Sequence, residues 1–318
     1  MLRIRQFTKG RDEKAWVNVY NAAFGDYEDI RNITADEMKK WEESPSFDEK
    51  GNFIAEWNGE IAGAVTAHVD KFREDKKGFI QNLGVLSKFR KRGIAAKLLE
   101  TALKSLKERG MELADTWAQT DREGCIHLFE KFGFKPIRTT SIMIRKLDNI
   151  EENSQAAPQL TIRDAILDDE KDIELLNRLD NEAFKEHFNF RPRTIEETKY
   201  TLFEMPWFSI QRWFIAVMDN HPIGYAGIAI DEGLNREKNL KWGMIADIGV
   251  LKPYRRKKVG TSLMLHMMHA LKNLGMEHAF LYVDNMNPTG ARKLYEKLGF
   301  KTLRKSIIYQ INLTERTQ

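Results

Sequence analysis

The chain has 318 residues, about twice the length of a typical domain, with 42% hydrophobic and 31% charged residues. This composition excludes a wholly disordered or fibrous chain. No apolar stretch approaches the ~20 residues of a membrane helix, and the first residues lack the apolar segment of a signal peptide, so we expect a cytoplasmic protein without a membrane partner. The net charge of +4 indicates a mixed surface. The single cysteine, Cys125, excludes an internal disulfide and a cysteine-based metal site.

Hydrophobic periodicity predicts the same series of elements twice. In the first half we expect a short opening strand, then a helix over 11–25, paired strands within 51–70, a strand at 79–86, a helix over 92–110, a strand at 112–118, a short helix ending at Gly133 and a last pair of strands. The second half repeats this order at 169–187, 211–231, 244–251, 258–274 and 278–284, with its short helix ending at Gly299. Each half therefore belongs to the α+β class, with a mixed, mostly antiparallel sheet flanked by helices.

An internal duplication explains this order. Residues 126–135 match residues 292–301 at six of ten positions, and residues 83–90 resemble residues 248–255. The period of about 160–165 residues is too long for a solenoid repeat and fits a duplicated domain. We predict an N-terminal domain at 1–148, a polar linker at 149–158 and a C-terminal domain at 159–318.

A basic loop joins a strand to a helix in each half, at residues 85–95 and 250–260. A small residue at the start of the helix lets several backbone N–H groups surround one point, and the positive end of the helix dipole adds to their effect. Such a loop predicts a pyrophosphate site. The lysines and arginines could also be read as nucleic-acid contacts, but both clusters fall in these loops, so one phosphate-bearing ligand explains them and no nucleic-acid partner is expected.

The loops resemble the R/Q-x-x-G-x-G/A pattern of the GNAT superfamily of acyl-CoA-dependent N-acetyltransferases. The first copy matches the pattern completely over residues 90–95. The second copy has Arg255 and Gly260, but Lys258 stands where the first glycine belongs. Both copies also carry the superfamily's closing helix before a Gly-Phe pair. The resemblance implies two tandem GNAT domains that cover nearly the whole chain.

The resemblance further implies acetyl-CoA as co-substrate, and we expect no metal. The strand edges at 83–86 and 248–251 would receive its pantetheine arm, and a backbone N–H near Val250 or Leu251 would bind the thioester oxyanion. The implied cofactor-binding residues are Val85, Leu86, Arg90, Lys91, Arg92, Gly93, Ile94 and Ala95 in the first copy, and Val250, Leu251, Arg255, Arg256, Lys257, Lys258, Val259, Gly260 and Asn287 in the second.

Tyr295 matches the tyrosine with which the superfamily protonates the departing thiolate, although a core aromatic is the alternative interpretation. Its counterpart in the first copy is Phe129, which has no proton to give. We therefore expect the first copy to bind acetyl-CoA but to catalyse poorly. Asn285 is an alternative to Asn287 for the contact with the cofactor arm, and the first copy has Asp121 at that place.

Asp247, on the strand before the second loop, is the first candidate for the general base, because a carboxylate there could take the amine proton directly or through water. Its alternative role is a structural hydrogen bond at the strand end. Glu204 is a weaker candidate, and the superfamily's commonest base falls at Met244. The aromatic residues at 207–208 and 213–214 either line an acceptor pocket or pack in the core.

These features predict an N-acetyltransferase that transfers the acetyl group of acetyl-CoA to a primary amine, by direct attack in a ternary complex in the second copy, with a small molecule as acceptor. A protein or peptide N-acetyltransferase is the alternative within the enzyme class. A non-catalytic CoA-binding sensor or scaffold is the alternative outside it. The tandem arrangement is similar to that of the mycothiol synthases within the superfamily, but the sequence does not identify the acceptor. We expect a monomer or homodimer.

Overall fold

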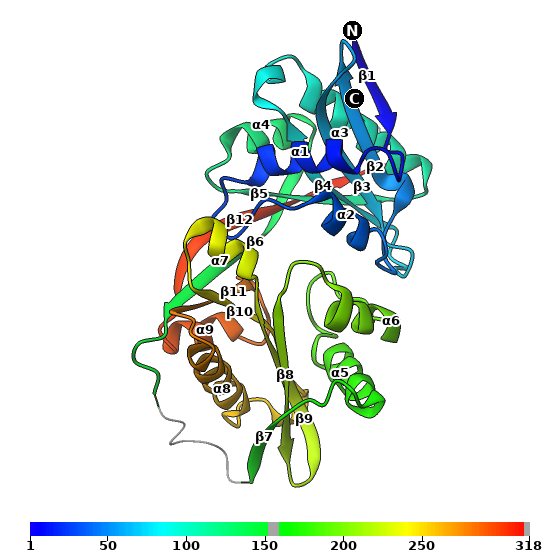
Figure 1. Ribbon diagram of the computed structural model, residues 1–318. Helices are drawn as coiled ribbons and strands as arrows, with labels where there is room; N and C mark the ends of the chain where they lie inside the picture. The colour runs from blue at the N-terminus through cyan, green and yellow to red at the C-terminus, as the bar shows by residue number, and fades with distance from the viewer. Residues whose placement is uncertain (152–158, 315–318) are drawn as a thin grey trace. The chain divides into compact units, whose positions relative to one another are not determined.

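The computed structural model describes residues 1–151 and 159–314. They form two compact units (Figure 1). The first comprises Met1–Thr139 together with the C-terminal segment from Lys305, and the second comprises Thr140–Arg304. Most of the linker predicted at 149–158 lies outside the described residues.

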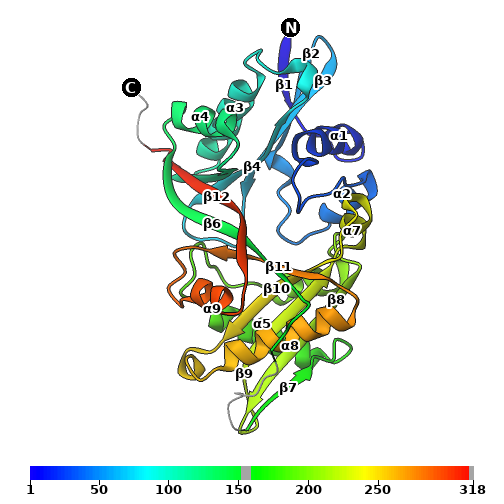
Figure 2. The same ribbon diagram turned by 90° about the vertical axis from the view of Figure 1, so that its left-hand side faces the viewer.

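The first unit is a sheet with helices on both faces. Its elements are β1 (Leu2–Gln6), α1 (Glu13–Phe24), α2 (Ala35–Trp41), β2 (Asn52–Trp57), β3 (Glu60–Val69), β4 (Lys77–Val85), α3 (Ile94–Glu108), β5 (Leu113–Gln119), α4 (Glu123–Lys131) and the C-terminal half of β12 (Lys301–Asn312). The strand order is β1-β2-β3-β4-β5-β12, and the β4–β5 pair is parallel whereas its neighbours are antiparallel. Helices α1 and α2 cover one face, and α3 and α4 cover the other (Figure 2).

The second unit repeats this design. Its elements are the C-terminal part of β6 (Lys135–Lys146), β7 (Leu160–Asp164), α5 (Glu170–Ala183), α6 (Ile195–Lys199), β8 (Ile210–Met218), β9 (His221–Ile230), α7 (Glu232–Lys238), β10 (Trp242–Val250), α8 (Val259–Asn273), β11 (His278–Asp284) and α9 (Ala291–Lys297). The order is β7-β8-β9-β10-β11-β6, with a parallel β10–β11 pair. The predicted α+β class, with a mixed and mostly antiparallel sheet, is confirmed.

The last strand of each copy belongs to the sheet of the other unit. Residues 140–146 of β6 pair with β11, and residues 306–312 of β12 pair with β5. The predicted pair of strands at each end is wrong, because each end is one continuous strand, rich in β-branched residues and without an internal glycine. The compact units therefore do not coincide with the domains predicted at 1–148 and 159–318.

Short helices were also missing from the predicted series. α2 and α6 each begin with a capping box, in which Thr34 and Glu37, or Thr194 and Glu197, bond to each other's backbone N–H groups. The T-x-x-E spacing was the available signal for both helices.

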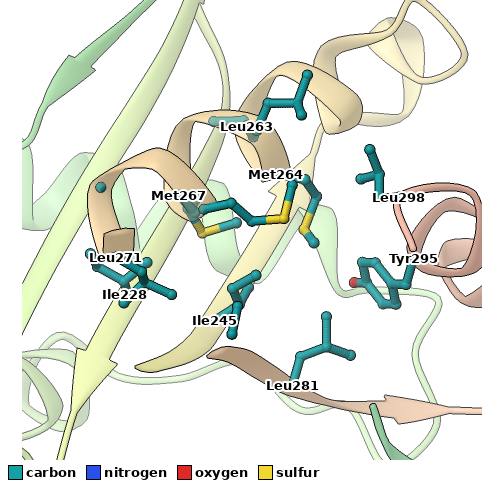
Figure 3. Packing of buried hydrophobic residues seen from close by; sticks show 14 of the residues in the cluster. Ile228, Ile245, Leu263, Met264, Met267, Leu271, Leu281, Tyr295 and Leu298 are labelled. Carbon is teal, nitrogen blue, oxygen red and sulfur yellow. The ribbon is translucent and has the colours of Figure 1, made fainter. Parts of the chain in front are cut away.

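A buried helix packs on each sheet and forms the core. In the second unit, α8 buries Leu263, Met264, Met267 and Leu271 against the sheet residues Ile228 and Ile245 (Figure 3). α3 does the same in the first unit with Leu98, Leu99, Ala102 and Leu106. Since both helices begin in the basic loops, this packing fixes where each loop lies relative to its sheet.

The parallel strands separate after a short contact. β4 pairs with β5 only over Lys77–Phe79, and β10 pairs with β11 only over Trp242–Met244. Beyond these residues, β4 and β10 continue to their basic loops. The edges that faced β5 and β11 are no longer paired with those strands. A register shift between Ile245 and Asp247 marks a bulge in β10, and a shift opposite Ala64 and Thr66 marks the equivalent bulge in β4.

Candidate active site

The two basic loops have the same backbone conformation. Gly93 precedes α3 with φ +79° and ψ 1°, and Lys258 precedes α8 with φ +62° and ψ 4°. Lys91 and Arg256, two residues earlier in each loop, also have positive φ angles of 61° and 65°. A non-glycine residue in this region costs roughly 1–2 kcal/mol, but the lysine at the first glycine position does not change the shape of the loop.

Backbone donors are exposed where these helices start. Neither helix has a side chain that caps its first turn, and the first intrahelical bond reaches back from Lys97 N to Gly93 O in α3 and from Ser262 N to Lys258 O in α8. The N–H groups of the first helical residues therefore have no partner within the helix. Together with the helix dipole they form an arrangement suited to a pyrophosphate.

An arginine ties each loop to the preceding strand. Arg90 Nε donates to Val85 O at 3.1 Å, and Arg255 Nε donates to Val250 O at 3.0 Å. Arg255 also donates to Ala183 O at 3.0 Å and to Glu186 Oε2 at 2.7 Å. Hydrogen bonds from Lys252 and from Arg255 lower the pKa of Glu186 to about 2. The second loop is thus held to the end of α5 as well as to its own strand.

The open edge of β10 contains one backbone donor at the predicted oxyanion position. Leu251 N donates to Ile223 O at 2.9 Å, so this N–H is used by β9. Since successive N–H groups of a strand point to opposite edges, that of Val250 points away from β9, to the edge where pairing with β11 has ended. Of the two residues considered, Val250 is therefore the one with a suitable donor.

Ionisable side chains of α5, β9 and β10 lie close together in the second unit. Tyr225 on β9 donates its hydroxyl to Asp180 Oδ1 on α5 at 2.6 Å, and Arg193 Nη1 lies 3.7 Å from Asp180 Oδ2. Asp247 occupies the bulge of β10, where its Oδ1 accepts from Ile248 N at 3.1 Å. Burial, followed by the negative charge of Asp180, raises the pKa of Asp247 to about 7, although the Arg193 charge and the nearby Tyr225 hydroxyl act in the opposite direction.

Tyr295 on α9 completes this group. It is 6% exposed and lies among Met264, Leu281 and Leu298, with its phenol oxygen directed to the side of β10 (Figure 3). Burial and then the charge of Asp247 raise the pKa of Tyr295, so the phenol is protonated at neutral pH. Tyr295 is part of the core, as the alternative interpretation held, and it also lies within electrostatic range of Asp247. We call Asp180, Tyr225, Asp247 and Tyr295 the acid–tyrosine cluster.

The first unit lacks every member of this cluster. The correspondence between the units follows from the strand registers of the two sheets. It also follows from matching hydrogen bonds, of Asn21 to Ile33 in the first unit and of Asn181 to Arg193 in the second. The positions of the four cluster residues are taken by Tyr20, Ala64, Asn82 and Phe129. The sequence prediction missed Asp180 and Tyr225, but a residue-by-residue comparison of the repeats for charges present in one copy alone would have found Asp180.

The remaining predicted residues have simpler surroundings. Asn287 Oδ1 accepts from the backbone N and hydroxyl of Thr289, so its amide stabilises the turn before α9. Asn285 bonds to Ser141 at 2.9 Å. Glu204 is exposed. Of the aromatic residues, those at 213–214 are buried in the core and those at 207–208 are half-buried.

Residues 1–151 and 159–314 contain no group of three or more His, Cys, Asp or Glu side chains that could hold a metal ion. Within the same residues no helix is long and apolar enough to cross a membrane.

A duplicated mixed sheet, whose central parallel strands separate beside a basic loop, is the architecture of a class of acyltransferases. The model of the Acetyltransferase (GNAT) family matches residues 16–134 and 176–300, and the chain belongs to this family. The protein is therefore an acyltransferase of a family that uses acetyl-CoA as co-substrate, as the sequence motifs predicted.

Some curated relatives match this chain over most of its length, and others match less than half of it. A mycothiol acetyltransferase of Actinosynnema mirum is 23% identical over 275 residues, which cover 84% of this chain and 86% of the relative. A mycothiol acetyltransferase of Streptomyces griseus is 30% identical over 131 residues, which cover 41% of this chain and 42% of the relative. In the latter match the chain spans less than half the relative's length.

Solved structures show the same fold over nearly the whole chain. A tandem GNAT protein from the clavulanic acid biosynthesis pathway has a TM-score of 0.74 at 14% identity, covering 99% of this chain and 100% of its own. A GCN5-related N-acetyltransferase from Sphaerobacter thermophilus has a TM-score of 0.70 at 18% identity, covering 98% and 96%. The predicted tandem arrangement is thereby confirmed.

Proposed function

We propose that this protein transfers the acetyl group of acetyl-CoA to a primary amine of a small molecule, by direct attack in a ternary complex in the second unit. The observation that supports this most strongly is the acid–tyrosine cluster, because it is built around Asp247 on β10, the strand with the open edge, and has no counterpart in the first unit. The name shared by the relatives, mycothiol acetyltransferase, favours a small-molecule acceptor over a protein.

Asp247 is the proposed general base. An ammonium group must lose a proton before its nitrogen can attack a thioester, and a base is most effective when its pKa lies near the working pH. Asp247, with a pKa of about 7, meets this condition, whereas an ordinary aspartate does not. Asp180 is a positioning residue, since its charge keeps the pKa of Asp247 high.

Tyr295 is the proposed general acid for the departing thiolate. The charge of Asp247 raises the pKa of Tyr295, so this phenol keeps its proton while the base is ionised. Once Asp247 has taken the amine proton, that charge is gone and Tyr295 becomes a better acid. The nitrogen–carbonyl bond forms, the carbon–sulfur bond breaks, and the proton lost by Tyr295 can be replaced from Asp247. The N–H of Val250 stabilises the oxyanion between these steps.

The first unit is proposed to bind acetyl-CoA without transferring its acetyl group. Its loop has the same backbone conformation as that of the second unit, with Gly93 at the strained position. Phe129 and Asn82 offer neither an acid nor a base at the positions of Tyr295 and Asp247.

The test is thiol release from acetyl-CoA across a panel of amines, with CoA binding measured by calorimetry. We expect turnover in the wild type, a loss of well over tenfold in Tyr295→Phe, and unchanged turnover in the matched variant Phe129→Tyr. A wild-type protein that binds CoA but releases no thiol with any amine would refute the enzymatic proposal and favour a CoA sensor or scaffold. Equal losses from damage to either loop would refute a single active site.

A further inference from the structure

A polar pocket lies in the first unit, on the face of the sheet that α2 covers. Its volume is about 190 Å³, enough for about six water molecules. Trp41 and Phe47 contribute an aromatic wall, their rings 5.3 Å apart in a T-shaped contact. Asn52 and Thr66 are fully buried, and His68 and Gln81 are half-buried.

The second unit fills the equivalent space with apolar groups. Trp213 faces Gly227 across the β8–β9 ladder, as Asn52 faces Thr66 across the β2–β3 ladder. The Trp213 ring lies so close to Gly227 that a β-carbon there would stand 2.6 Å from Trp213 Cζ3. The same correspondence places Ala229 at His68 and Ala246 at Gln81. In the second unit this space is filled by the Trp213 ring among small residues. In the first unit, four hydrogen-bonding side chains surround a pocket there: Asn52, Thr66, His68 and Gln81.

A cavity with this lining is suited to a ligand with hydrogen-bonding groups. Polar groups that line an open pocket bond to water, and a ligand that displaces this water must supply hydrogen-bonding groups in its place. Asn52 and Thr66 satisfy each other through a 2.8 Å hydrogen bond, and Asn52 Nδ2 also donates to Asp48 O at 3.1 Å. The amide of Gln81, by contrast, has no protein partner among the described residues. It therefore offers both a donor and an acceptor to a bound molecule.

The charge of the pocket is balanced. Asp48, the carboxylate of its lining, accepts from Arg109 Nη1 at 2.6 Å and from Val69 N at 2.7 Å. A charged ligand would lose its hydration without gaining an ion pair. The aromatic wall instead favours a molecule with one apolar face. We propose that this pocket binds a neutral polyhydroxylated small molecule, no larger than a monosaccharide, with its apolar face on Trp41 and its hydroxyl groups on Gln81.

The test uses D-glucose and sorbitol as probes, with saturation-transfer NMR and calorimetry on the full chain. We expect a dissociation constant in the millimolar range and at least tenfold weaker binding in Gln81→Ala, which adopts the residue of the second unit. His68→Ala, which does the same at the neighbouring position, serves if Gln81→Ala fails to fold. Glucuronate, the charged counterpart of glucose, should bind at least tenfold more weakly.

Three results would overturn the proposal. The first is the absence of binding by both neutral probes at about 10 mM. The second is binding that is unchanged in a folded Gln81→Ala or, in its place, His68→Ala protein. The third is glucuronate binding as tight as that of glucose. Each is independent of acetyl transfer, because the variants lie in the first unit and the assays measure binding alone.

Discussion

Replacing Asp247 with asparagine keeps the size of the side chain but removes its ability to take a proton. If Asp247 is the general base, kcat/KM should fall by about 10²–10⁴-fold, the usual contribution of such a group. In the wild type, kcat/KM should rise with pH through a limb near pH 7, because Asp247 must be ionised to act and its pKa is raised to about 7 by burial and the Asp180 charge. The variant should lack this limb.

The same change should stabilise the fold. Between pH 4 and 7 the folded protein holds a proton on Asp247 that the unfolded chain releases, so the free energy of unfolding falls as the pH rises through this window. Raising the pKa from 3.8 to about 7 corresponds to at most about 4 kcal/mol lost above pH 7. Asp247→Asn should therefore exceed the wild type in stability by up to this amount at pH 8, and by less at pH 5. Urea unfolding at both pH values measures the difference.

The matched control is Asn82→Asp, which introduces a carboxylate at the equivalent bulge of the first unit. It should leave turnover unchanged, because Phe129 offers no acid beside it. A limb near pH 7 that persists in Asp247→Asn would refute the assignment of the base. So would a loss of activity below tenfold, or a variant that is less stable than the wild type at pH 8.

Three further changes test other parts of the site. Tyr295→Phe should lower kcat by well over tenfold with little effect on CoA affinity, whereas Phe129→Tyr should change neither, as thiol release and calorimetry will show. Asp180→Asn should move the limb of the kcat/KM profile to lower pH, because it removes the charge that raises the pKa of Asp247. Lys258→Gly should change the free energy of unfolding by about 1 kcal/mol or less, since relief of the positive φ is offset by the greater freedom of glycine in the unfolded chain.

Each of these has a contrary outcome. Equal losses from the two aromatic substitutions would mean that the loss in Tyr295→Phe comes from disturbed packing and not from the missing phenol proton. An unchanged pH profile in Asp180→Asn would mean that its charge does not act on the base. A large loss of stability in Lys258→Gly, measured by urea unfolding, would mean that the lysine side chain holds the loop.

The repeat was visible in the sequence because it depends on local patterns. Basic residues followed by the start of a helix are a local pattern that favours an anion-binding loop, so the loops at 85–95 and 250–260 and the family itself could be predicted. Comparison of the copies also singled out Tyr295 and Phe129, since a motif aligns them position by position. The role of Tyr295 in proton transfer stays a prediction.

Tertiary structure decided the features that join distant segments. The exchange of the final strands depends on which edge is open to pair, and β6 and β12 carry no local mark of it. The meeting of Asp180 on a helix with Tyr225 and Asp247 on two strands depends on the bulge in β10 and on the register between sheet and helix. The polar pocket arises where Trp213 is replaced by Asn52 and several neighbours change with it. Local sequence determines elements and loops, whereas burial, shifted pKa values and cavities arise from contacts between residues far apart in the chain.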